Sequence, residues 1–274
     1  PSSTEPSSTE PSSTEPSSTE PGIGSDSSAL SGPLQPRSVE LTGSPTAVLA
    51  GEDETELDYE VLGDLGEGGM GTVHLARQVA LGRDVALKQI RRTSRGEASV
   101  RDEFLMEAVL TGKLEHPNIV PVYELGKSPE GDLFYSMKNI VGQPWEELID
   151  TRSLDENLVI LLDVCDAVAF AHSKSVIHRD LKPQNIMVGA FGEVLVLDWG
   201  MALLVPADED VVASPGGTPA YMAPEMVTPP YRLGRRTDVY LLGGLLFRIL
   251  TGQTPHQGDS ALECLKSASR NTIC

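Results

Sequence analysis

The sequence predicts an α+β fold in which a β-rich first half precedes a mostly helical second half. Between residues 57 and 140, short segments with strand character are interrupted by a single segment with helical spacing. After Glu146, apolar residues recur with helical spacing over much longer segments. We therefore expect a sheet with one helix, followed by a helical bundle.

Five strands and one helix are expected in the first half. Order should begin near Leu57, and residues 59–62 alternate as a first strand does. Residues 72–77 and 84–90 are predicted as the next two strands, and residues 120–125 and 133–138 as the last two. Between them, residues 100–113 place Phe104, Leu105, Ala108 and Val109 at helical spacing.

Two long helices are expected in the second half. Residues 154–173 carry an apolar face that includes Leu158, Leu161, Leu162 and Cys165. Residues 237–251 are apolar nearly all round, which predicts a helix buried on every side.

The first 56 residues have a different character. Residues 1–20 are four copies of Pro-Ser-Ser-Thr-Glu, and residues 21–56 remain rich in Gly, Ser, Pro and acids. A segment with so little apolar surface to bury should be disordered. We expect a linker, and a phosphoacceptor or docking tail is the alternative.

Charge and composition exclude several classes of protein. The chain of 274 residues has a net charge of −19, and residues 1–60 hold twelve acids and one base. Nucleic-acid binders need a basic footprint, so we expect no nucleic-acid partner. The three cysteines form no CxxC pair, which fits reduced thiols in a cytoplasmic protein. No apolar run is long enough to span a bilayer, and no secretory signal is evident.

The stretch at residues 176–200 carries the strongest chemical signal. Asp180, Lys182 and Asn185 lie within six positions, and Asp198 follows after a short predicted hairpin. Two carboxylates, a lysine and an amide at this spacing are the groups needed to move a phosphoryl group held by magnesium.

Two upstream segments add phosphate-binding groups. Residues 66–73 read G-x-G-x-x-G-x-V, and glycines let a backbone turn approach phosphate oxygens. A dinucleotide-binding loop would open a helix, whereas a strand pattern follows Gly71. Lys88 lies on the third predicted strand and needs a carboxylate to hold it. Glu107 on the following helix is the preferred partner, and Glu103 is the alternative.

Taken in order, these segments resemble eukaryotic-like bacterial serine/threonine protein kinases. The resemblance includes G-T-P-A-Y-M-A-P-E at residues 217–225 and covers about residue 57 to the C-terminus. It implies a bilobal protein-kinase fold, with a β-rich N-lobe at about 57–140 and a helical C-lobe at about 141–274. The C-lobe would lack its last helices, since residues 262–269 resemble the helix that follows 237–251.

The resemblance also implies an ATP site with Mg²⁺, for which Mn²⁺ is the alternative ion. Asp180 would orient the attacking hydroxyl, Lys182 would face the transferred phosphoryl, and Asn185 and Asp198 would bind the metal. The remaining nucleotide contacts would come from Gly66, Glu67, Gly68, Gly69, Met70 and Gly71 on the phosphates, Val73, Ala86 and Met187 around adenine, Met137 as gatekeeper, and the Lys138 and Ile140 backbones. His178 would be structural, and Thr218 would contact Asp180, with a phosphosite as the alternative.

The implied activity is phosphorylation of Ser/Thr hydroxyls in protein substrates, including the protein itself. Two departures from the family pattern leave a nucleotide-binding pseudokinase or truncated scaffold as the alternative. Trp199 stands where the family usually has Phe, and the partner arginine of Glu225 would lie in the missing helices. A membrane tether in a missing segment is a further expectation of the resemblance.

Overall fold

The computed structural model describes residues 37–38, 41–42, 58–68, 71–90, 98–128, 131–206 and 209–273. All of them belong to one compact unit, Pro36–Cys274. The Pro-Ser-Ser-Thr-Glu repeats, most of residues 21–56, Gly69 and Met70 lie outside the described residues, so what the sequence predicts for them stays a prediction.

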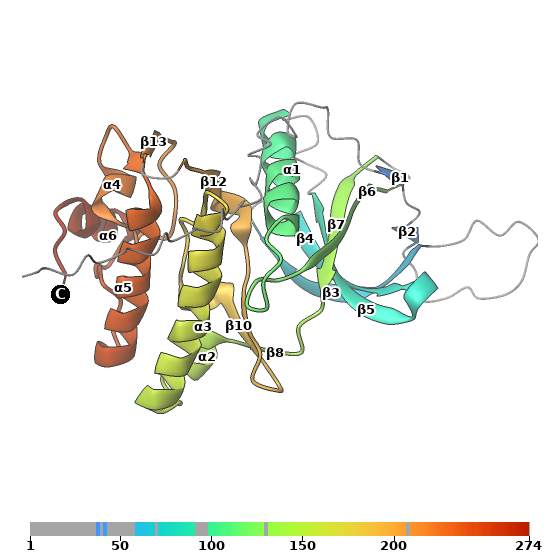
Figure 1. Cartoon of the computed structure of the whole chain (residues 1–274), viewed down its shortest axis with the longest axis horizontal. Coiled ribbons are helices and arrows are strands. Elements are labelled where there is room, and N and C mark those ends of the chain that lie inside the picture. Colours follow the sequence, from blue (N-terminus) through green and yellow to red (C-terminus); the bar gives the residue numbers. More distant parts are fainter. Residues whose placement is uncertain are drawn as a thin grey trace, which may run out of the picture. The chain divides into compact units, whose positions relative to one another are not determined.

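The N-terminal part is a seven-stranded sheet with the order β1-β6-β7-β5-β4-β3-β2 (Figure 1). Its strands are β1 (Arg37–Ser38), β2 (Leu41–Thr42), β3 (Tyr59–Glu67), β4 (Gly71–Gln78), β5 (Arg83–Ile90), β6 (Val122–Lys127) and β7 (Leu133–Lys138). The strands β3 to β7 pair antiparallel and confirm the five that the sequence predicts. The sequence did not predict the two edge strands β1 and β2, which pair parallel with β6 and β3.

One helix, α1 (Ala98–Gly112), connects β5 to β6 and lies against the sheet, as predicted (Figure 1). Phe104 and Ala108 on α1 form a buried cluster with Ile90, Leu133 and Tyr135 of the sheet. This cluster fixes the helix over the strands that carry Lys88 and its neighbours.

The C-terminal part is mainly helical. Its helices are α2 (Trp145–Leu148), α3 (Leu154–Ser173), α4 (Pro224–Val227), α5 (Arg235–Thr251) and α6 (Ala261–Ser269). Helices α3 and α5 pack side by side (Figure 1). A capping box starts α3, because Ser153 and Glu156 each accept a hydrogen bond from the other's backbone N–H. Gly252, with a φ of 72°, ends α5 in the left-handed conformation that favours glycine.

Short strands connect the helices and shape the loops between them. They are β8 (Gly142–Pro144), β9 (Val176–Ile177), β10 (Ile186–Gly189), β11 (Val194–Val196), β12 (Leu203–Leu204), β13 (Val211–Val212) and β14 (Arg232–Leu233), together with the 3-10 helices η3 (Pro183–Asn185) and η4 (Trp199–Met201). A further 3-10 helix, η1 (Val79–Leu81), connects β4 to β5 in the sheet. The sequence predicted a hairpin before Asp198, and β10 and β11 form it.

Helix α5 differs from the sequence prediction. It was expected to be buried on every side, yet Val239, Leu246 and Leu250 are exposed by 59%, 37% and 61%. Within the described residues, α3 and β9 cover one side of α5, so its apolar composition did not translate into burial all round. No helix in the described ranges is both long enough and apolar enough to cross a membrane.

Candidate functional site

The loop between β9 and η3 carries Asp180 and is held by a buried carboxylate on α5. Asp238, in the first turn of α5, accepts hydrogen bonds from the backbone amides of His178 at 2.8 Å and Arg179 at 2.9 Å. It also bonds His172 Nε2 at 2.8 Å. Arg179 has a φ of 71°, which is uncommon for a residue with a side chain. The Asp238 contacts stabilise this conformation, and the sequence did not predict them.

His178 has the structural role that the family resemblance implied. Its Nδ1 accepts from the Asp180 amide at 3.2 Å, and its Nε2 donates to the Leu197 carbonyl at 3.0 Å. Its ring lies 4.6 Å from that of Trp199. Both ring nitrogens are therefore engaged in holding the loop next to Asp198.

The carboxylate of Asp180 is the centre of a dense polar cluster. Its Oδ1 accepts from Thr218 Oγ1 at 2.7 Å, and its Oδ2 accepts from Lys182 Nζ at 2.7 Å and Asn185 Nδ2 at 3.2 Å. Lys182 also donates to Thr218 Oγ1 at 2.7 Å. A carboxylate offers about four acceptor positions. Since three side chains already donate to Asp180, its carboxylate can accept one further hydrogen bond, from a hydroxyl group.

A second cluster joins the sheet to α1. Lys88 Nζ lies 2.6 Å from Glu107 Oε1 and 3.8 Å from Asp198 Oδ1. Glu107 is buried, whereas Glu103 is exposed and does not form this pair. Of the two partners that the sequence left open for Lys88, the structure pairs it with Glu107.

Asp198 and Trp199 begin the next loop. Asp198 has a φ of 57°, and its side chain is 53% exposed, so its carboxylate is accessible to a ligand. Trp199 is buried at 1% exposure and its Nε1 donates to the Val196 carbonyl at 3.4 Å. The larger indole is thus accommodated in the core beside His178.

Asn185 completes the arrangement around Asp180. Its amide nitrogen donates to the Asp180 carbonyl at 2.8 Å as well as to the carboxylate. The nitrogen is therefore turned toward Asp180, and the side-chain oxygen is the atom that can ligate a metal.

The residues expected around a nucleotide lie on strands next to Lys88. Val73 on β4 is the register partner of Lys88, and Ala86 on β5 is the partner of Met137 on β7. Met187 lies on β10, in the C-terminal part. Gly71 approaches the Gln89 carbonyl so closely that a Cβ would collide with it, which explains glycine at that position.

The last adenine-site candidates, Lys138 and Ile140, lie at the end of β7 and just after it. The Lys138 amide donates to the Pro121 carbonyl at 3.1 Å, so this amide is already engaged within the protein. Lys138 Nζ pairs with Glu193 at 2.5 Å. Gly66 pairs with Val73, and Gly68 N–H donates to the Gly71 carbonyl at 2.8 Å. The roles of these residues in nucleotide binding remain predictions.

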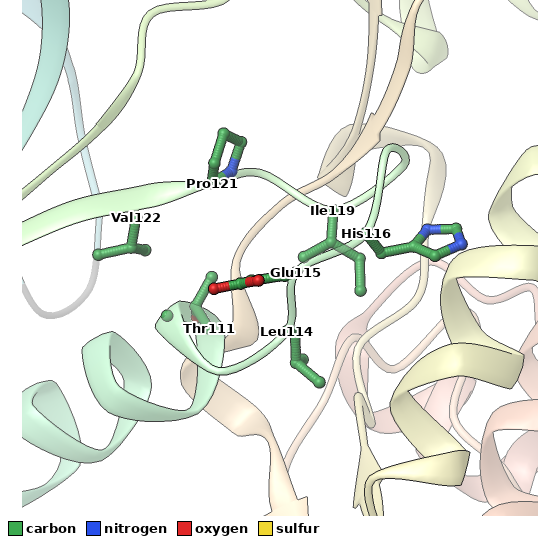
Figure 2. A pocket seen from close by; sticks show the side chains of 8 residues that line it. Thr111, Leu114, Glu115, His116, Ile119, Pro121 and Val122 are labelled. Carbon is green, nitrogen blue, oxygen red and sulfur yellow. The ribbon is translucent and has the colours of Figure 1, made fainter.

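Two hollows lie beside α1. A pocket of about 340 Å³ at the end of α1 is lined by Thr111, Gly112, Leu114, Glu115, His116, Ile119, Pro121 and Val122 (Figure 2). A larger one of about 910 Å³ lies between α1 and residues 199–204 and 211–215. Arg179 lines the larger hollow and donates to the carbonyls of Met201 at 3.1 Å and Ser214 at 2.7 Å. The loop that carries Asp180 is thereby connected to the segment that leads to Thr218.

Glu225 also has a partner among the described residues. The family resemblance implied that the arginine partner of Glu225 is missing. In the structure, Glu225 Oε1 accepts a hydrogen bond from Thr237 Oγ1 at 2.9 Å. The hydroxyl satisfies one oxygen of this carboxylate at the start of α5.

Comparison with known proteins identifies the family to which the chain belongs. The model of the protein kinase domain family matches residues 59–273. The serine/threonine-protein kinase PknD of Protochlamydia amoebophila is 34% identical over 249 residues, which cover 77% of this chain and 25% of the relative. PknD of Chlamydia trachomatis serovar D is 37% identical over 235 residues, covering 73% and 25%. This chain thus spans about a quarter of the length of these curated relatives. With its β-rich and helical parts and the two polar clusters between them, the chain belongs to the protein kinase domain family.

Proposed function

We propose that this domain transfers the γ-phosphoryl group of ATP to Ser or Thr hydroxyls of protein substrates, including its own chain. The observation that carries the proposal is Lys88, which pairs with Glu107 and lies 3.8 Å from Asp198. This arrangement places a held cation beside a carboxylate that is free to take a metal, as phosphoryl transfer requires.

Asp180 is the proposed catalytic base. It accepts the proton of the substrate hydroxyl as the hydroxyl oxygen forms its bond to the γ-phosphorus, while the bond from that phosphorus to the bridging oxygen breaks and ADP leaves. Lys182, which donates to Asp180 Oδ2 at 2.7 Å, offsets the negative charge of the phosphoryl oxygens. Thr218 fixes the other oxygen of Asp180.

Asn185 and Asp198 are the proposed metal ligands. Mg²⁺ is usually held by one or two carboxylates together with substrate phosphates, and one exposed carboxylate beside one amide oxygen fits that donor set. When bound, the ion neutralises charge on the phosphate oxygens. Mn²⁺ prefers the same oxygen ligands.

For the nucleotide itself, we propose the contacts that the family resemblance implies. Lys88 and the glycine-rich segment at residues 66–71 bind the phosphates, and Val73, Ala86 and Met187 enclose adenine below the gatekeeper Met137. Ile140 is suited to bind the base, because within the described ranges its backbone amide donates no hydrogen bond.

For the chain as a whole, we propose a kinase domain over residues 57–274, preceded by a linker, and a cytoplasmic location. Protein substrates reach the site from the side of residues 217–222, where Thr218 meets Asp180. The net charge of −19 supports the expectation that nucleic acid is not a partner.

Phosphate transfer tests the proposal directly. The purified chain is incubated with ATP and Mg²⁺, alone and with a generic basic protein substrate, and incorporated phosphate is measured. Asp180→Asn should abolish transfer, while Asp166→Asn, at an exposed position on α3, should leave it unchanged. Wild-type transfer no higher than that of Asp180→Asn would overturn the proposal, and retained ATP binding in that case would indicate a pseudokinase.

A further inference from the structure

A tyrosine on the sheet shares the glutamate that holds Lys88. Tyr135 lies on β7 and is the direct register partner of Lys88 on β5. Partners in register point to the same face of a sheet, and here that face is covered by α1. Tyr135 Oη donates to Glu107 Oε1 at 2.8 Å, the same oxygen that Lys88 Nζ meets at 2.6 Å.

Glu107 depends on few donors for its position. Its residue exposure is 2%, and its Oε2 is buried without a hydrogen-bond partner among the described residues. Lys88 and Tyr135 therefore supply the hydrogen bonds to its side chain. A buried carboxylate needs its partners, because an unpartnered charge in a low-dielectric site is costly.

Tyr135 also contacts α1 through its ring. The ring lies 5.3 Å from that of Phe104, one turn before Glu107 on α1. Lys88 Nζ lies 5.9 Å from the centre of the same ring. Tyr135 thus contacts the helix at two points and the lysine at a third. The ring of Tyr135 is rigid, whereas the ammonium group of Lys88 is carried by a flexible four-carbon chain.

The phenol is suited to act as a permanent donor. Burial, with the neighbouring Glu107 carboxylate as a second cause, raises the pKa of Tyr135 well above its ordinary value. The hydroxyl therefore keeps its proton and donates to Glu107 throughout the physiological pH range.

We propose that Tyr135 is a positioning residue, which holds Glu107 from the sheet so that Lys88 presents its ammonium group to the nucleotide phosphates. The inference rests on the proposed function, since it assigns Tyr135 a part in nucleotide binding. In this arrangement the sheet sets the position of α1 through a rigid ring and a hydrogen bond, and Lys88 is left free to bind phosphate as well as Glu107.

A second buried tyrosine in the same sheet provides a matched control. Tyr59 is 0% exposed, and its Oη bonds Glu124 at 2.8 Å and Ser136 at 2.9 Å, but neither Lys88 nor Glu107. Tyr135→Phe and Tyr59→Phe each delete one buried phenol oxygen from the same sheet. Both should lower the melting temperature, so only an effect on the nucleotide separates positioning from ordinary core packing.

The test measures ATP–Mg²⁺ affinity by calorimetry together with steady-state kinetics. Tyr135→Phe should raise the Kd and KM for ATP roughly tenfold, the effect of losing a hydrogen bond to a charged group, and leave the KM for the protein substrate unchanged. Tyr59→Phe should alter neither constant for ATP. Unchanged ATP constants in a folded Tyr135→Phe protein would overturn the inference, as would an equal effect of Tyr59→Phe.

A double-mutant cycle tests whether Tyr135 acts through Glu107. In a Glu107→Gln background, Tyr135→Phe should change ATP affinity by less than about twofold, because neighbouring groups that act as a unit are not additive. A full effect in that background would contradict the inference. If the wild type binds ATP but transfers no phosphate, the proposed function fails while the binding comparison still decides the role of Tyr135. If the wild type does not bind ATP, both fail.

Discussion

Thr218 offers the sharpest test of the catalytic cluster, because its hydroxyl touches two charged groups at once. It donates to Asp180 Oδ1 and accepts from Lys182 Nζ, both at 2.7 Å. The other Asp180 oxygen has its own donors, Lys182 and Asn185. Thr218→Val keeps the shape of the side chain and deletes the hydroxyl. One carboxylate oxygen then loses its donor, and the carboxylate is free to rotate.

The magnitude follows from the charged partner. A hydrogen bond to a charged group contributes about 1.5–3 kcal/mol, and each 1.4 kcal/mol corresponds to about tenfold in rate. We therefore expect kcat for Thr218→Val to fall about 10- to 100-fold. The KM for ATP should stay near the wild-type value, because Thr218 contacts Asp180 and Lys182 and not Lys88.

The assay is phosphate transfer to a protein substrate at saturating ATP, with Thr218→Ser as the control. Serine retains the hydroxyl, so its activity should remain within a few-fold of the wild type. A kcat for Thr218→Val within about twofold of the wild type would refute the structural role. Phosphopeptide mapping provides a second check, because a phosphate on Thr218 in the most active fraction would favour the phosphosite reading instead.

Two further predictions concern stability. Trp199→Phe should lower the free energy of unfolding by about 1–2 kcal/mol, since the buried indole beside His178 would leave unfilled volume, and urea denaturation that shows no change would contradict this. Asp150→Asn should destabilise at pH 7, because both oxygens of exposed Asp150 accept from Arg248, at 2.6 and 2.7 Å. These bonds lower the pKa of Asp150, so its contribution is present above the ordinary pKa and lost as the pH falls through the lowered one. The difference in melting temperature between wild type and variant should therefore shrink below about pH 4, and a difference independent of pH would argue against the ion pair.

Local pattern was sufficient to predict most of the elements. Strand alternation and helical spacing located β3 to β7, α1 and α3. Helical spacing left both Glu107 and Glu103 open as partners of Lys88, and the family resemblance favoured Glu107. Those elements depend on residues close together in the sequence, where period and spacing carry the information. The same kind of reasoning could place Tyr135 on a strand but not next to Lys88, because register between β5 and β7 is set by tertiary packing.

The prediction for α5 failed for a related reason. An apolar helix is buried only on the sides that other elements cover, and the composition of α5 says nothing about how many elements those are. Asp238 was a signal in that helix that sequence reasoning left without a role. A carboxylate in an otherwise apolar segment is costly unless it has partners, so its presence predicts buried donors nearby, although not which ones.

Those donors make the loop that carries Asp180 dependent on a residue outside it. Asp238 holds the amides of His178 and Arg179, and Asp180 follows immediately, so contacts from the start of α5 orient the Asp180 carboxylate. Arg179, held in the left-handed region, in turn donates to the carbonyls of Met201 and Ser214. The loop that carries Asp180, the segment before Thr218 and α5 therefore share one set of hydrogen bonds. A substitution at Asp238 should for that reason lower catalysis and stability together.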